Sequence, residues 1–204
     1  RLTLTAVSDE ETGGAWGALY LLREHARLVR GDAVLNGEPG DPRTVRFCEK
    51  GTLRLTFTIR TPGAHGAYPN KSANANRIAG RLMDELDTLE ELRPATPPAL
   101  AALLARDDVR RRIDEAMGAG TSEIVDRVTV NVGVVEGGLK VNLIPGTCRM
   151  ELDIRLPIGL EREVILDRLG EILRGFPEVT LKVQEEASNR ASYSEPAHEL
   201  VALL

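Results

Sequence analysis

The sequence contains little cysteine, few aromatic residues and no long apolar run. Of its 204 residues, 2 are cysteines, Cys48 and Cys148, and 3% are aromatic. Two cysteines so far apart in the chain give neither a disulfide framework nor a zinc-knuckle spacing, so we expect a reducing, cytoplasmic environment. No stretch approaches the ~18 consecutive apolar residues of a membrane-spanning helix, so we expect no membrane as a partner.

Charge of one sign is not in large excess. The chain has 26 basic and 31 acidic side chains, for a formal net charge of -5. Because the basic residues are interleaved with acidic ones, we expect no nucleic-acid partner. With 28% charged and 42% hydrophobic residues, the composition also excludes low-complexity, collagen-like and acidic disordered chains. The length suits one large domain, or one and a half small ones.

The first 49 residues have the pattern of a strand, a helix and a second strand. A strand is predicted at 1–7, a helix at 15–30 that ends at Gly31, and a short buried strand at 33–35. The helix residues expected to face inward are Trp16, Leu19, Leu22, Ala26 and Val29. This order predicts a right-handed βαβ unit with two parallel strands.

Acidic residues follow both of these predicted strands. Asp9, Glu10 and Glu11 follow the first strand, and Glu38 follows the second. Ligands of parallel sheets bind beyond the carboxyl ends of the strands. Adjacent glutamates point in different directions, so one can bind a metal while the other takes a proton from metal-bound water, whose pKa falls toward ~7. The alternative is a solvated acidic turn before a helix, where carboxylates favour the N-terminal dipole.

Residues 50–187 follow a different pattern. Apolar and polar residues alternate in four segments, as in strands buried on one face, and two segments carry the apolar stripe of a helix. In chain order these are a strand at 53–60, a helix at 75–89, strands at 128–134 and 148–155, a helix at 160–173 and a strand at 179–183. This βαββαβ order predicts a ferredoxin-like sandwich with one polar sheet face. A helix that starts near Pro97 and ends at 118–120 forms an insertion at about 93–123.

Three further polar residues are candidates for a site. His65 lies in a glycine-rich loop at 63–69, Asn142 lies in a turn between strands, and Arg155 lies on the polar face of its strand. Each has an ordinary alternative: an exposed loop histidine, a turn residue and a solvated surface cation. None of the three indicates chemistry by itself.

Taken in order, four segments resemble the co-catalytic zinc aminoacylase and carboxypeptidase family, which includes acetylornithine deacetylase, succinyl-diaminopimelate desuccinylase and glutamate carboxypeptidase-like enzymes. The matching segments are 8–14, 36–39, 63–69 and 142–145, the last followed by 153–155. The resemblance covers essentially the whole chain. It implies an α/β fold in which a partial parallel-sheet catalytic domain, residues 1–49, carries an inserted ferredoxin-like lid and dimerisation domain, residues 50–187, and residues 188–204 return to the catalytic domain.

The resemblance also implies roles for single residues. Glu10 resembles the general base, Glu11 the metal ligand beside it, and Glu38 a ligand of the second metal. His65 resembles a lid histidine that reaches the neighbouring subunit's site and stabilises the oxyanion of the tetrahedral intermediate. Asn142 and Arg155 resemble the lid groups that hold the substrate, Arg155 by a bidentate bond to its carboxylate.

The metal implied by the family is zinc, two ions per site, although carboxylates also accept cobalt or manganese. The family's His-x-Asp motif, its bridging Asp and its C-terminal ligand His are missing from the sequence. Because a co-catalytic site needs about four ligands per metal, we expect this chain alone neither to hold two zinc ions nor to turn over substrate. The chain opens inside a predicted strand and stops at the start of a predicted helix, so we expect a fragment.

The function that follows is the central piece of a metal-dependent amidohydrolase that cleaves N-acyl amino acids or small peptides and forms a homodimer through residues 50–187. The alternative from another class is a non-catalytic dimerisation module, because the exposed edges of the predicted sheet invite pairing with a second copy. A carbohydrate hydrolase with Glu10 and Glu38 as acid and base is a third hypothesis. It gives no account of the lid segments.

Overall fold

A computed structural model describes residues 2–10, 13–37 and 44–204. It divides into two compact units. The first unit comprises Arg1–Val45 with Leu203–Leu204, and the second unit comprises Arg46–Ala202.

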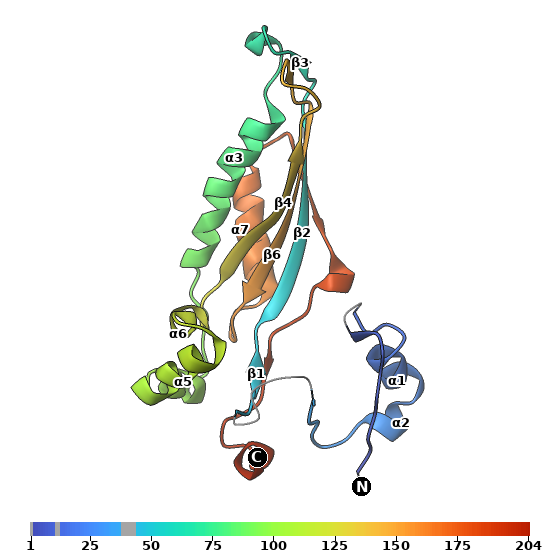
Figure 1. The fold of residues 1–204 in the computed structure, drawn as a ribbon, viewed down its shortest axis with the longest axis vertical. Coiled ribbons are helices and arrows are strands. Elements are labelled where there is room, and N and C mark those ends of the chain that lie inside the picture. The colour runs from blue at the N-terminus through green and yellow to red at the C-terminus, as the bar shows by residue number, and fades with distance from the viewer. Residues whose placement is uncertain (1, 11–12, 38–43) are drawn as a thin grey trace. The chain divides into compact units, whose positions relative to one another are not determined.

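A four-stranded antiparallel sheet is the centre of the second unit (Figure 1). Its strands are β2 (Gly51–Arg60), β4 (Thr129–Gly137), β6 (Thr147–Leu156) and β7 (Val179–Val183), and their order across the sheet is β4-β6-β2-β7. Two helices, α3 (Ala75–Leu86) and α7 (Arg162–Leu173), supply buried residues to the same core as the sheet. The alternation of apolar and polar residues predicts these strands, and the apolar stripes predict these helices.

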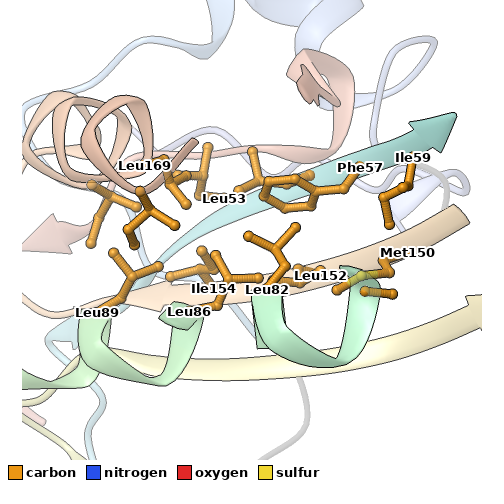
Figure 2. Packing of buried hydrophobic residues seen from close by; sticks show 14 of the residues in the cluster. Leu53, Phe57, Ile59, Leu82, Leu86, Leu89, Met150, Leu152, Ile154 and Leu169 are labelled. Carbon is orange, nitrogen blue, oxygen red and sulfur yellow. The ribbon is translucent and has the colours of Figure 1, made fainter. Parts of the chain in front are cut away.

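The core forms because one face of β2 and β6 is apolar. In the antiparallel register Leu53 lies opposite Ile154, and Phe57 lies opposite Met150. These side chains are almost completely buried, and the α3 and α7 side chains pack on them (Figure 2). The residues between them point to the other face, because successive side chains of a strand alternate.

Helix α3 begins at a side-chain cap. The Asn74 side chain accepts hydrogen bonds from the backbone N–H groups of Asn76 and Arg77, at 3.0 and 3.2 Å, and so caps the N-terminus. The helix was predicted to reach residue 89. It instead ends at Leu86 and continues as a 3-10 helix, η3 (Asp87–Glu91), which still buries Leu89.

The insertion contains three helices where one was predicted to run from Pro97 to Gly118. They are α4 (Pro98–Leu104), α5 (Asp107–Met117) and α6 (Thr121–Ile124). The break lies at Arg106, which has an extended backbone and precedes two aspartates in the first turn of α5. Aspartates favour a helix N-terminus, so they start a new helix rather than continue the first.

The first unit contains two short helices, α1 (Ala18–Glu24) and α2 (Ala26–Val29). Over its described residues, 2–10 and 13–37, it contains no strand, so the predicted strands at 1–7 and 33–35, and with them the parallel βαβ unit, are wrong there. Parallel strands need cover on both faces. Here Leu2 and Leu4 are 97% and 94% exposed, so no layer covers them.

The inward stripe predicted for the first helix is wrong at three of its five residues. Trp16 is 85% exposed, and Leu19 and Leu22 are exposed as well, whereas Ala26 and Val29 are half-buried. The helix is interrupted at His25, whose backbone leaves the helical region between α1 and α2. With little apolar surface to pack against, the sequence pattern does not by itself produce one long helix.

The remaining elements are short. Strand β1 (Cys48–Glu49) pairs with β8 (Ser192–Tyr193), and β3 (Ala64–His65) pairs with β5 (Leu143–Ile144). Two 3-10 helices, η2 (Pro69–Lys71) and η4 (Glu185–Ala187), and the terminal helix α8 (Glu199–Leu203) complete the described chain. Among the described helices, none combines the length and the apolar character that crossing a bilayer requires.

Candidate functional site

His65 and Asn142 are brought side by side by the small ribbon β3-β5. His65 lies opposite Leu143 in the antiparallel register, and the backbone N–H of Gly66 donates to the carbonyl of Asn142 at 2.7 Å. The ribbon follows β2 and precedes β6, so it lies at one end of the large sheet (Figure 1). Two sequence-predicted site residues therefore share one location.

Glycine allows the two loops to approach so closely. A Cβ on Gly66 would lie 3.0 Å from the carbonyl oxygen of Asn142, and Gly63 has a positive φ of 69°. The N–H of Gly63 donates to the Ser72 hydroxyl at 2.9 Å, which ties the loop to the segment before α3. The glycines of the loop at 63–69 are thus a backbone requirement of the ribbon.

The His65 ring is held at one nitrogen and open at the other. Its Nδ1 accepts a hydrogen bond from the backbone N–H of Ala67 at 3.2 Å. In the neutral ring the proton then lies on Nε2, which has no hydrogen-bond partner among the described residues. The ring lies 5.9 Å from that of Tyr68, centroid to centroid. An exposed, oriented N–H donor is the group that an oxyanion needs.

Arg155 lies at the other end of the sheet. It is opposite Thr52 of β2 and Thr129 of β4, near the carboxyl end of β6. Eight residues separate it from Thr147 at the start of the strand, which corresponds to about 27 Å along the strand. A single copy of the chain therefore does not bring Arg155 together with His65 and Asn142.

The Arg155 guanidinium is paired on the polar face of the sheet. Its Nη2 lies 2.8 Å from Oδ2 of Asp153, and its side chain is 43% exposed. The other carboxylate oxygen of Asp153, Oδ1, is buried and has no hydrogen-bond partner among the described residues. Asp153 was not predicted as a site residue. The signal was present, since residues two apart in a strand share a face and these two carry opposite charges.

Lys50 interacts electrostatically with Arg155 and is another residue that no sequence motif predicts. Its Nζ donates to the carbonyl oxygens of Ile124 and Arg127, each at 2.6 Å. Burial lowers the pKa of the Lys50 ammonium, the carboxylate of Asp126 acts in the opposite direction, and the nearby Arg155 lowers the pKa further. No sequence pattern points to bonds between such distant segments.

Glu10 lies in a tight, exposed turn of the first unit. Its carbonyl accepts from the N–H of Gly13 at 2.9 Å, and Gly13 and Gly14 have positive φ angles of 94° and 67°. The Asp9 carboxylate accepts from the backbone N–H of Trp16 at 2.7 Å, ahead of α1. The turn therefore forms at the place where the sequence predicts it. Glu11 and Glu38, the predicted metal ligands, lie outside the described residues.

Within the described ranges, no three His, Cys, Asp or Glu side chains gather as a metal site would require. Glu10 alone is one carboxylate, and a catalytic zinc needs about three protein ligands. The described residues by themselves therefore do not fit a bound metal. The groups in place are the His65 imidazole at one end of the sheet, in a loop whose backbone bonds that of Asn142, and the paired Arg155 guanidinium at the other end.

Comparison with known proteins identifies relatives. Residues 48–178 match the family described as the peptidase dimerisation domain. The chain is similar to an acetylornithine deacetylase from Myxococcus xanthus, with 29% identity over 100% of this chain and 48% of the relative. It is also similar to a probable carboxypeptidase from Paracoccidioides lutzii, with 30% identity over 88% of this chain and 37% of the relative. The chain thus spans less than half the length of these curated relatives.

Solved structures share the fold. An M20 family metallo-carboxypeptidase from Sulfolobus solfataricus matches with a TM-score of 0.66 and 14% identity, over 90% of this chain and 48% of the other. A di-peptidase from Saccharomyces cerevisiae matches with a TM-score of 0.53 and 12% identity, over 76% of this chain and 39% of the other. At such low identity the likeness concerns the fold alone.

Proposed function

Because the chain belongs to the M20 peptidase dimerisation domain family, we propose that it is part of a metal-dependent amidohydrolase that cleaves the amide bond of N-acyl amino acids or small peptides. The observation that carries the proposal is the ribbon β3-β5, which holds His65 beside Asn142 with the imidazole Nε2 open. Relatives described as a deacetylase and a carboxypeptidase support the reaction class.

The proposal assigns a role to each region of the chain. Residues 1–49 contribute to a catalytic domain, residues 50–187 form a ferredoxin-like lid and dimerisation domain, and residues 188–204 lead back to the catalytic domain. The strand order β4-β6-β2-β7, with α3 and α7 packed on one core, supports the ferredoxin-like assignment.

The lid residues act on a substrate held between two subunits. Nε2 of His65 donates to the oxygen that becomes negative when the amide carbonyl is attacked, and Asn142 beside it holds the substrate. In each subunit, Arg155 binds the substrate carboxylate in one active site of the dimer, and His65 acts in the other active site. The separation of about 27 Å along β6 supports this division, because one small substrate cannot reach both ends of one sheet.

A homodimer through residues 50–187 supplies the second subunit. The edge strands of the sheet are β4 and β7, and an edge strand offers unpaired backbone groups to a second copy. Strand β4 also exposes Val135, so we assign the contact to this edge.

We assign the metal to the whole amidohydrolase of which this chain is proposed to be a part. The proposal takes Glu11 and Glu38 as ligands of two zinc ions and Glu10 as the general base, as the resemblance implies. Since the described residues gather no ligand set, the support for the function comes from the lid residues.

The experiment is a steady-state measurement on the full-length protein with N-acetyl amino acids as substrates. His65→Ala removes the oxyanion donor, so kcat falls about 10²–10³-fold with KM nearly unchanged. The matched control is His25→Ala, an exposed histidine between α1 and α2, which leaves kcat unchanged. Equal kcat for His65→Ala and the wild type would refute the assignment.

The second candidate function is a non-catalytic dimerisation module. It is favoured by one observation: the large core lies in the second unit. This function predicts a dimeric full-length protein that releases no amino acid from any N-acetyl substrate, with or without added zinc.

A further inference from the structure

We propose that a pocket on the helical insertion binds a free α-amino acid at a site separate from His65, Asn142 and Arg155. The pocket has a volume of about 510 Å³ and lies within the second unit. Its walls come from the segment before α4, from α5, and from α6 with the turn after it. Its polar lining comprises Arg93, Thr96, Arg110, Glu123, Asp126 and Arg127.

The charged groups of this lining are not paired with one another. Within the described part of the chain, the three arginines make no ion pair within 4.0 Å, and neither do the two carboxylates. Elsewhere on the insertion the charges do pair: the guanidinium of Arg106 donates to both carboxylate oxygens of Asp108, at 3.1 and 2.8 Å. Arg93 donates to the backbone carbonyl of Glu90 at 3.0 Å, Asp126 interacts electrostatically with Lys50, and Arg110 with Asp114. None of these contacts is an ion pair within 4.0 Å, so the pocket still presents both signs of charge to a ligand.

The wall between α5 and α6 is fixed by a clamp. The carboxylate of Asp114 accepts from the backbone N–H of Ser122 at 2.7 Å and from its hydroxyl at 3.1 Å, and Ser122 is buried. Arg110 lies one turn before Asp114 on α5, and Glu123 directly follows Ser122. The clamp thus ties the backbone of α5 near Arg110 to that of α6 next to Glu123.

The other two walls are also anchored. Lys50 binds the carbonyl oxygens of Ile124 and Arg127, which fixes the turn after α6. The N–H of Ala95 donates to the carbonyl of Gly159 at 3.0 Å, and Gly159 has a positive φ of 90° with no room for a Cβ beside Ala95. A pocket with anchored walls loses little entropy on binding, which favours a small ligand.

The lining selects the ligand by its charges. Three guanidinium groups attract a carboxylate, which an arginine fork binds at two points. A simple anion would leave Glu123 and Asp126 facing it, and like charges repel. A molecule with a carboxylate and an ammonium group satisfies both sets. Because the volume also accommodates a side chain, the class is the free α-amino acids. This inference does not rest on the proposed hydrolysis.

The experiment is calorimetric titration of the 204-residue chain with L-glutamine, a zwitterion without a charged side chain. Acetate, methylammonium and inorganic phosphate serve as probes that carry one sign of charge. We expect saturable binding of L-glutamine at one site, and binding of each other probe weaker by about tenfold or more because one set of charges stays unpaired.

Variants locate the site. Arg127→Gln, Arg110→Gln and Glu123→Gln each weaken L-glutamine binding about tenfold, whereas Arg106→Gln, an arginine of the same insertion outside the pocket, leaves it unchanged. Circular dichroism verifies that each variant is folded. The proposal is overturned by the absence of saturable L-glutamine binding, by phosphate binding as tight as L-glutamine, or by a folded Glu123→Gln variant that binds L-glutamine like the wild type.

Discussion

The two units of the chain carry the same kind of apolar residue in opposite environments. In the second unit Leu55, on β2, is fully buried between β6 and β7. In the first unit Leu4, also in a segment predicted as a strand, is 94% exposed. The difference indicates that a period-2 or period-3.6 pattern becomes a stable element only where a second apolar surface packs against it. We therefore expect nearly all of the folding free energy of this chain to reside in the second unit.

The matched pair Leu55→Ala and Leu4→Ala tests this comparison with the largest effect. Leu55→Ala leaves a cavity in the core, so the free energy of unfolding falls by roughly 2–5 kcal/mol. Leu4→Ala changes it by no more than about 0.5 kcal/mol, because an exposed side chain gains little on folding. Urea unfolding followed by far-UV circular dichroism measures both. Equal losses for the two variants would contradict the division.

The Asp114 clamp gives a smaller effect that depends on pH. Its hydrogen bonds, chiefly the one from the backbone N–H of Ser122, hold the pKa of the Asp114 carboxyl below its ordinary value. Because the folded pKa is below the unfolded one, the stabilisation is complete at neutral pH. It is lost as the pH falls through the unfolded pKa of about 3.9 and then through the folded pKa.

Asp114→Ala should therefore lower the thermal midpoint at pH 7, and its difference from the wild type should shrink toward zero as the solution is acidified below pH ~4. The control is Glu115→Ala, next to it on α5, whose carboxylate makes only an exposed pair with Arg111 at 4.0 Å. If the difference in thermal midpoint between Asp114→Ala and the wild type grows on acidification, the clamp is not the source of the stabilisation.

Labelling of the two cysteines measures how often the core of the second unit opens, and it is the smallest of the expected effects. Cys148 is buried in the core and Cys48 is half-buried, and burial raises the pKa of both thiols. Because the thiolate is the reactive form, we expect iodoacetamide to modify Cys48 first at pH 8, and Cys148 only when the second unit opens. Leu55→Ala should accelerate modification of Cys148, and Leu4→Ala should not. Mass spectrometry of the labelled peptides distinguishes the two sites, and prompt modification of Cys148 in the wild type would show that the core is open.

The sequence predicts the second unit well because its strands and helices are long and cover one another. The alternation in β2 and β6 and the stripe of Ile78, Leu82 and Leu86 on α3 each correspond to buried positions. The predicted strands of the first unit fail for the same physical reason, since their described residues find no apolar partner. The break at Arg106 also escapes prediction, because the apolar residues of α4 and α5 read as one continuous stripe.

The candidate site is predictable only in part. The motifs show its residue types and their order. They do not show that the segments of His65 and Asn142 lie side by side, because β3 and β5 are two residues long and too short for a recognisable alternation of apolar and polar residues. The distance of Arg155 from them follows from strand length once β6 is known. The unpaired charges of the pocket are invisible in sequence, since pairing depends on where α5 and α6 are clamped.

Subunit complementation in the full-length protein tests the central claim most directly, namely that His65 acts in the partner's active site. Glu10→Ala and His65→Ala proteins are each expected to be nearly inactive. When they are unfolded together in equal amounts and refolded, half of the dimers are mixed and one of the two sites in each is intact, so about one quarter of the wild-type turnover of an N-acetyl amino acid returns. A mixture as inactive as its parents, with mixed dimers verified by mass, would contradict the account.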